Sequence, residues 1–123
     1  MTPPLKILFV CGRNKRRSPT AEKIFKGDPR MLVRSAGTSD SSKRRITAAD
    51  LHWADLVLVM QRKYAARIKV GFKDIDPLPP MESLDIGDDY IFMEVGLINI
   101  LRSSVDEALE NYYAEKEAEQ NPD

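Results

Sequence analysis

Short runs of consecutive apolar residues alternate along the chain with segments in which apolar residues recur every three or four positions. The clearest apolar runs lie at residues 5–10 (LKILFV) and 55–60 (DLVLVM), and we expect each to form a strand. We expect two further strands, at 31–37 (MLVRSAG) and 82–86 (ESLDI). Apolar residues follow one another in 5–10 and 55–60 without alternating with polar ones. Such continuity is typical of strands that are buried on both faces of a parallel sheet.

Helical periodicity follows each of the first two predicted strands. Ser18 can cap the first helix, with Pro19 in its opening turn. Thr47 opens the second helix, and Asp50 stands three residues later, as in a capping box. Both signals are local, and both predict where a helix begins.

The second half of the chain predicts two further helices, the last of them long. Residues 61–70 form the third, and apolar residues at helical spacing between Ile91 and Tyr112 predict the closing helix. Strands that alternate with helices predict an α/β three-layer sandwich, in which a four-stranded parallel sheet carries helices on both faces. We assign residues 1–114 to one domain and 115–123 to a polar C-terminal tail.

Length and composition fit one soluble domain. The chain has 123 residues, of which 42% are hydrophobic, enough for one core and too few for two. Its longest apolar runs fall far short of the roughly 20 residues that span a bilayer. We therefore expect a cytoplasmic monomer without a membrane segment.

Charge is distributed unevenly although the net charge is zero. Lys and Arg outnumber Asp and Glu by 12 to 3 over residues 1–45, and are outnumbered by 16 to 7 over residues 46–123. This asymmetry predicts that the first half of the chain binds an anion. Nucleic acid is less favoured as that anion, because the basic half lacks the interleaved aromatic residues on which bases stack.

The only cysteine, Cys11, stands where the first predicted strand passes into the first helix, in the stretch CGRNKRRSP. Ligands of open α/β sheets bind at the carboxyl ends of the strands, which is where this stretch lies. The N–H groups at a helix N-terminus favour phosphate. The glycine patterns of nucleotide-binding loops are absent. Neither Cys11 nor His52 has neighbours at metal-ligand spacing, so we expect no metal and no cofactor.

Cys11 and Arg17 bracket this loop, and Ser18 follows. Cations and the helix N-terminus favour the anionic thiolate of Cys11, which is the nucleophilic form. Arg17 can bind two phosphate oxygens at once, and the Ser18 hydroxyl can donate to the thiolate. These residue types in this order predict nucleophilic attack on phosphorus.

The stretch VCGRNKRRSPTAE resembles the signature of the low-molecular-weight protein tyrosine phosphatases, and SAGT (35–38), ADLVLVM (54–60) and IGDDY (86–90) resemble later segments of that family. The resemblance covers residues 5–39 and 46–112. It implies a phosphatase that works through a phosphocysteine intermediate, with phosphate as product and inhibitor. It also implies that Ser35 holds Asn14 and that one loop binds the phosphate group, namely Gly12, Arg13, Asn14, Lys15, Arg16 and Arg17.

The same resemblance places the general acid in LDIGDDY, which supplies Asp85, Asp88 and Asp89. The family's register is an aspartate, one residue and a tyrosine. It selects Asp88 and leaves Asp89 as the alternative. Tyr90 is then implied as a wall of the substrate pocket. A positioned acid of this kind typically accelerates departure of the leaving group 10²–10⁴-fold.

Departures from the family pattern bear on the substrate. Arg13 replaces a glycine, Arg16 a second cysteine and Lys15 an apolar residue, and the loop between Thr38 and Ile46 is short. Phosphotyrosine in a protein is the substrate implied by the family. Alternative substrates are phosphoarginine, a small phosphoester and a phosphorylated nucleic-acid end. A further alternative is a protein that binds phosphate or nucleic acid without catalysis. Arsenate reduction is less favoured because further cysteines are lacking.

Overall fold

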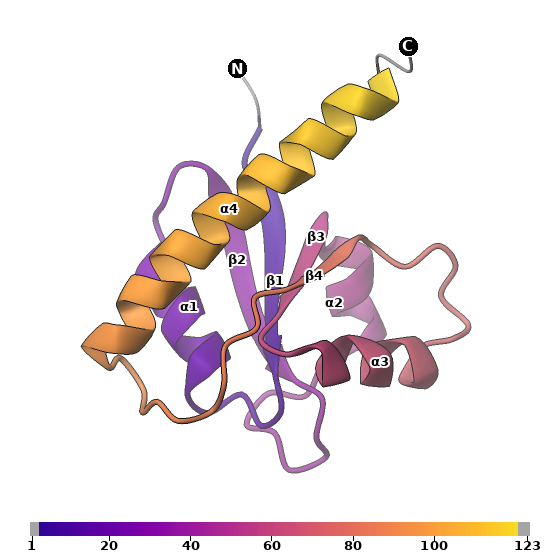
Figure 1. Cartoon of the computed structure of the whole chain (residues 1–123). Helices are drawn as coiled ribbons and strands as arrows, with labels where there is room; N and C mark the ends of the chain where they lie inside the picture. Colours follow the sequence, from indigo (N-terminus) through magenta and orange to yellow (C-terminus); the bar gives the residue numbers. More distant parts are fainter. Residues whose placement is uncertain (1–2, 121–123) are drawn as a thin grey trace.

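Four parallel strands form the centre of the protein (Figure 1). A computed structural model describes residues 3–120. The strand order across the sheet is β2-β1-β3-β4, and all pairings are parallel. The strands are β1 (Leu5–Cys11), β2 (Met31–Gly37), β3 (Leu56–Val59) and β4 (Met81–Ser83). The predicted fold class is thereby confirmed.

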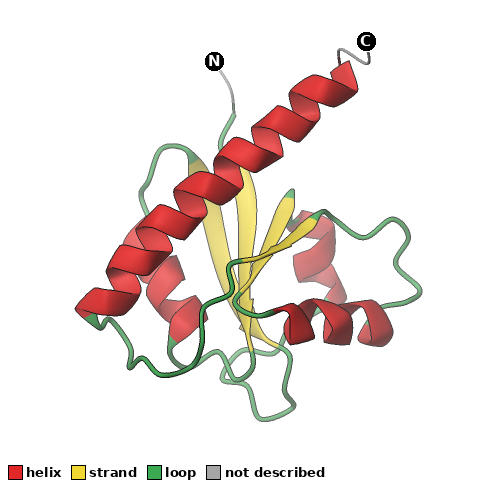
Figure 2. Ribbon diagram, in the orientation of Figure 1, coloured by secondary structure: helices red, strands yellow, loops and turns green. Residues whose placement is uncertain are grey.

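Helices cover both faces of this sheet (Figure 2). They are α1 (Arg17–Phe25), α2 (Ala48–Trp53), α3 (Arg62–Gly71) and α4 (Val95–Gln120). One face carries α1 and α4, which contact each other, and the other carries α2 and α3. Among residues 3–120, no helix is both long and apolar enough to cross a membrane.

The strand β1 is held from every side, and this fixes the position of Cys11. It pairs with β2 along its whole length and with β3 from Ile7 to Val10. Phe9 is fully buried and stacks on Phe25 of α1, with 5.9 Å between the ring centroids. Because β1 is immobilised by burial and by two ladders of hydrogen bonds, its last residue occupies a defined place at the carboxyl edge of the sheet.

The two predicted helix starts have different outcomes. The capping box of α2 is confirmed, with Asp50 N–H donating to Thr47 Oγ1 (3.2 Å) and Thr47 N–H donating to Asp50 Oδ2 (3.0 Å). The expectation that Ser18 caps α1 is wrong. That helix begins at Arg17, two residues before the start that a Ser18 cap would give, and its N-cap residue, Arg16, makes no side-chain cap hydrogen bond. The Ser18 hydroxyl bonds to other side chains in the interior.

The closing helix is shifted relative to its prediction. Its expected first residues, Ile91 and Phe92, precede it in a turn, and Met93 has a left-handed φ of 63°. The helix begins at Val95 and continues to Gln120, so residues 115–120 of the expected tail are helical. The remaining residues of that tail, 121–123, lie outside the described residues. Likewise β4 covers 81–83, whereas a strand was expected over 82–86.

Candidate active site

The loop that joins β1 to α1 surrounds a polar cavity at the carboxyl edge of the sheet. We call residues 11–17 the phosphate loop. The cavity has a volume of about 600 Å³. It is lined by Cys11, Gly12, Arg13, Lys15, Arg16, Arg17, Ser39, Tyr64, Arg67 and Asp88. The structure therefore brings together the predicted nucleophile, the predicted acid Asp88 and most of the predicted phosphate-binding residues.

The short segment 38–43 fixes the backbone of the phosphate loop from outside. Three successive carbonyl groups accept hydrogen bonds from it: Cys11 from the Thr38 N–H (3.1 Å), Gly12 from the Ser39 N–H (2.8 Å) and the Ser42 hydroxyl (3.0 Å), and Arg13 from the Lys43 N–H (3.0 Å). A planar trans peptide directs its N–H opposite to its carbonyl. The N–H groups that follow these carbonyls are thus turned away from segment 38–43, as an anion site requires.

A glycine makes this close approach possible. A Cβ atom at Gly37 would lie 2.8 Å from the Gly12 carbonyl oxygen and would also collide with the Ser42 side chain. Real Cβ contacts are not found at such distances, so a side chain at position 37 would push segment 38–43 off the phosphate loop.

The thiol of Cys11 faces a hydroxyl. Cys11 is 4% exposed, and its Sγ lies 2.9 Å from Ser18 Oγ. Asn14 Nδ2 donates to the same Ser18 oxygen at 2.9 Å, which leaves the Ser18 hydrogen free to donate in turn. Its two possible acceptors are Cys11 Sγ and the Ala36 carbonyl, which is farther away at 3.5 Å. The arrangement favours donation to sulfur when Cys11 is a thiolate.

The hydrogen bonds continue from Asn14 into the interior. Asn14 has a left-handed φ of 55°, and its Nδ2 also donates to Ser35 Oγ at 3.0 Å. Ser35 in turn donates to Glu22 Oε1 at 2.6 Å. We call Ser18, Asn14 and Ser35, all buried, the Ser–Asn–Ser network. It holds the phosphate loop in shape and sets the direction of the hydrogen bond that reaches Cys11.

Arg17 is 5% exposed and is oriented by three acceptors from distant parts of the chain. NH1 donates to Gln61 Oε1 and to the Ile86 carbonyl, each at 2.7 Å, and NH2 donates to the Tyr64 hydroxyl at 2.7 Å. Both NH1 hydrogens and one NH2 hydrogen are thus occupied. Nε has no acceptor among residues 3–120, so Nε and the second NH2 hydrogen remain as a fork for two oxygens of an anion.

The predicted acid segment is held at its two ends and exposed between them. The Ile86 N–H donates to the Met60 carbonyl (2.8 Å), and the Met93 N–H donates to Thr20 Oγ1 (3.0 Å). Asp88 lies between these anchors, is exposed and lines the cavity. Asp89 does not line it. In the described part of the chain no cluster of three or more His, Cys, Asp or Glu side chains could hold a metal ion.

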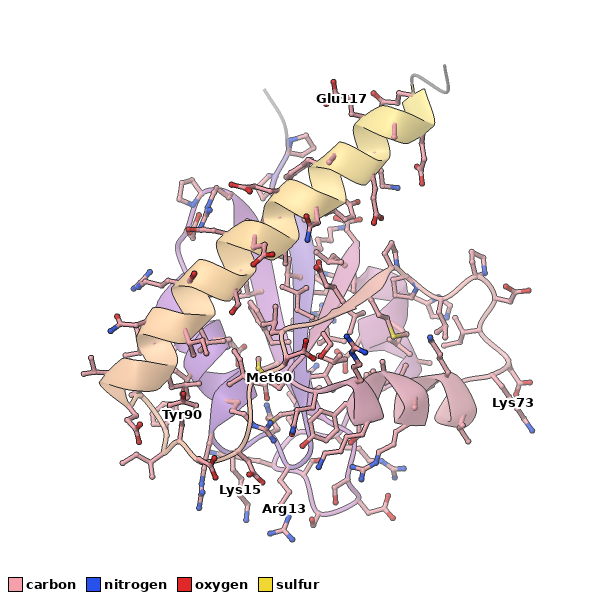
Figure 3. The ribbon with its side chains drawn as sticks, in the orientation of Figure 1. Arg13, Lys15, Met60, Lys73, Tyr90 and Glu117 are labelled. Atoms are coloured by element: carbon pink, nitrogen blue, oxygen red, sulfur yellow. The ribbon has the colours of Figure 1, made fainter. Side chains whose placement is uncertain are left out.

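Tyr90 lies outside the lining of the cavity. Its ring is close to Gly96, and Figure 3 shows it beside the first turn of α4. The same view shows Arg13 and Lys15 extending from the phosphate loop away from the sheet. Four residues at or next to the site were not predicted from the sequence: Gln61, Tyr64, Glu22 and Arg67. The polar residues that directly follow the buried strand β3 are the one signal that could have pointed to Gln61.

Comparison with known proteins bears on the fold. No family model and no curated protein sequence matches the chain. Among solved structures, the tyrosine phosphatase Wzb from Escherichia coli K30, in complex with phosphate, matches with a TM-score of 0.66 at 18% identity, covering 86% of this chain and 96% of Wzb. The low molecular weight protein tyrosine phosphatase from T. tengcongensis matches with a TM-score of 0.63 at 22% identity, covering 87% of this chain and 99% of the phosphatase.

A third solved structure is similar over nearly the whole length of both chains. The YwlE arginine phosphatase from Geobacillus stearothermophilus has a TM-score of 0.56 and 23% identity, with 95% of each chain covered. The chain therefore has the fold of the low-molecular-weight tyrosine phosphatases, and the predicted resemblance is confirmed at the level of the fold.

Proposed function

We propose that this protein is a cysteine-dependent phosphatase that hydrolyses phosphomonoesters through a phosphocysteine intermediate. The observation that supports this most is the position of Cys11 Sγ, 2.9 Å from the Ser18 hydroxyl within a loop whose carbonyls are tied outward. A site that only bound phosphate would need the loop and the cations. It would not need a thiol with its own hydrogen-bond donor.

In the first step the Cys11 thiolate attacks phosphorus, a sulfur–phosphorus bond forms, and the bond from phosphorus to the leaving oxygen breaks. The free fork of Arg17 binds two of the phosphoryl oxygens, and the N–H groups of the phosphate loop stabilise the charge that develops there. Asp88 in its protonated form donates a proton to the leaving oxygen.

In the second step a water molecule attacks the phosphocysteine. The Asp88 carboxylate, which has just lost its proton, accepts one from that water. A new oxygen–phosphorus bond forms, the sulfur–phosphorus bond breaks, and inorganic phosphate is released. Donation from Ser18 to sulfur stabilises the departing thiolate, which is the role that the Ser–Asn–Ser network supports.

We propose phosphotyrosine in proteins as the substrate, in keeping with the similarity to two tyrosine phosphatases. Phosphoarginine is the second candidate, because the YwlE structure that covers most of both chains is an arginine phosphatase. A matched pair of peptides that carry either phosphotyrosine or phosphoarginine in the same flanking sequence would separate the two.

The test of the proposed function is hydrolysis of an aryl phosphate. We expect turnover by the wild type, none by Cys11→Ser, and a loss of several orders of magnitude in Arg17→Ala, since two charge-assisted hydrogen bonds are lost. Rapid acid quenching should trap a phosphorylated wild-type protein, detected by intact mass, that Cys11→Ser does not form. Turnover by Cys11→Ser, or loss of wild-type turnover on addition of a chelator, would contradict the mechanism.

A further inference from the structure

Four cationic side chains surround the mouth of the cavity, and we call them the mouth cations: Arg13, Lys15, Arg16 and Arg67. All four are exposed and line the cavity. Over residues 3–120 none of them forms a salt bridge or a side-chain hydrogen bond; Arg67 lies over the Tyr64 ring, with 5.5 Å from Cζ to the centroid.

Of the six arginines outside the cavity in the described part of the chain, five contact a carboxylate within 4.0 Å, and the sixth, Arg102, lies over the Phe25 ring. Arg44 contacts Asp50 at 2.6 Å, and Arg45 contacts Asp40 at 2.8 Å. Arg44 and Arg45 directly follow the tethered residues 38–43. The three arginines of the cavity mouth therefore lack the carboxylate partner that most arginines outside the cavity have.

The charges in the cavity exceed what one phosphate group requires. Arg17 and the mouth cations supply five positive charges. The Cys11 thiolate and a phosphomonoester dianion supply about three negative charges, and Asp88, as proton donor, is neutral. Two positive charges therefore remain at the mouth, which is about the charge of one additional phosphate group.

We propose that the mouth cations form a second anion subsite, and that the preferred substrate carries a second phosphate group on its leaving group, close to the scissile one. This inference rests on the proposed function for the identity of the first site. Three of the four mouth cations are arginines, whose planar guanidinium groups bind phosphate with two parallel hydrogen bonds. One phosphate supplies in a single tetrahedral group the charge that two correctly placed carboxylates would have to supply.

The same cavity does not favour a nucleic-acid end. Tyr64 is the one aromatic side chain among the described residues that line it, and Tyr64 is 3% exposed. Its ring is flanked by the cations Arg17, Lys63 and Arg67. Without an exposed ring a base has no surface on which to stack.

The experiment compares kcat/KM for phosphotyrosine peptides that differ at one neighbouring residue, which is phosphoserine, glutamate or glutamine. We expect the phosphoserine peptide to be preferred over the glutamine peptide by about tenfold or more, with glutamate between them, since hydrogen bonds to charged groups contribute about 1.5–3 kcal/mol. A small bisphosphate and the corresponding monophosphate form a second arm. Preference in both arms assigns the subsite to phosphate in general, and preference in one arm identifies the source.

Variants locate the subsite. Arg67→Ala and Lys15→Ala should each lower the ratio of kcat/KM for the phosphoserine peptide over the glutamine peptide by about threefold or more. Lys69→Ala is the matched control, because it removes one cation from the same helix outside the cavity and should leave the ratio unchanged. The ratio should also fall with added salt, since the mouth cations are exposed to screening.

Binding to the Cys11→Ser variant separates failure of this inference from failure of the proposed function. Calorimetry should give a lower Kd for pyrophosphate than for orthophosphate, and Arg67→Ala should reduce the difference. If aryl phosphate is not hydrolysed but this preference persists, the proposed function is wrong and the subsite stands. The inference would be overturned if neither arm showed a preference, with phosphoserine equal to glutamine or glutamate and bisphosphate equal to monophosphate. A preference confined to 5′-phosphorylated oligonucleotides would also overturn it.

Discussion

The two halves of the proposed catalytic site are built differently. On the nucleophile side, Cys11, Ser18 and Asn14 are at most 4% exposed, and each has hydrogen-bond partners that are themselves buried. On the acid side, Asp88 is exposed and stands in a segment that is anchored at Ile86 and Met93.

This difference matches the role that we propose for each half. Nucleophilic attack needs sulfur, loop N–H groups and Arg17 in fixed positions before the substrate arrives, because reorganisation during the reaction would add to the barrier. The acid must deliver a proton to leaving groups of different shapes and take another from water. Anchors on either side of Asp88 place the carboxyl group at the cavity and leave it accessible to solvent.

After Cys11→Ser and Arg17→Ala, the largest effect is expected on the acid side. Asp88→Asn should reduce kcat for an aryl phosphate with a poor leaving group by about 10²-fold, and much less for a leaving group that departs without a proton. Asp89→Asn, outside the cavity, is the matched control and should have a smaller effect. Rates over a series of substituted phenyl phosphates measure both variants, and a larger effect of Asp89→Asn would transfer the acid role to that residue.

A smaller effect is expected from the Ser–Asn–Ser network. Asn14→Gly keeps access to the left-handed φ but removes both hydrogen bonds of the amide, and we expect kcat to fall about tenfold because the phosphate loop and Ser18 are less well positioned.

Asn14→Ala removes the same bonds and also opposes the positive φ, at about 1–2 kcal/mol, so it should unfold at lower urea concentration than Asn14→Gly. Kinetics and urea unfolding of the pair separate the two contributions. Wild-type kcat in Asn14→Gly would show that the hydrogen bonds of Asn14 do not support catalysis.

The smallest effect on activity is expected at Asp50, which does not line the cavity. Asp50 is 1% exposed and accepts from Arg44, whose other nitrogen donates to the Ser35 carbonyl. Burial alone would raise the pKa of Asp50, but hydrogen bonds from Arg44 and from the Thr47 backbone hold it below its ordinary value. Asp50→Asn should therefore lower the free energy of unfolding at pH 7 by about 2 kcal/mol.

The pH dependence follows from the direction of that shift. A carboxyl group whose pKa is lowered by folding stabilises the protein above its unfolded pKa of about 4, and this stabilisation is lost as the pH falls through the folded pKa. Urea unfolding of wild type and Asp50→Asn should differ fully at pH 7 and progressively less below pH 4. A difference that stays constant to pH 3 would mean that the charge of Asp50 does not contribute.

Local signals in the sequence were reliable where no distant group competes with them. The capping box of Thr47 and Asp50 joins residues three positions apart, and it forms as predicted. Ser18 carries an equally good capping signal, but Cys11 and Asn14 engage its hydroxyl instead. The end of α4 was missed for another reason, because residues 115–120 are polar but include good helix formers such as Ala, Glu and Lys.

The residues predicted for the site come together at one cavity where the motif is contiguous, and the prediction omits residues that distant parts of the chain contribute. Cys11 and Arg17 both line the cavity. The acceptors of Arg17 are separated from it by 44 to 69 residues, and no pattern in the sequence joins Gln61, Tyr64 or Ile86 to it. Tyr90 was placed by register with a family, and in the structure it packs beside α4.

The tethering of the phosphate loop by segment 38–43 also has a consequence for the order in which the site can form. The groups that shape the phosphate loop and face Cys11 all come from the first 43 residues of the chain. They begin with Asn14 in the loop itself and end with Lys43 in segment 38–43. The side chains and carbonyl that aim Arg17 come later, at residues 61–86. During synthesis, the residues that shape the phosphate loop are therefore all present in the chain before the residues that orient Arg17 have been added.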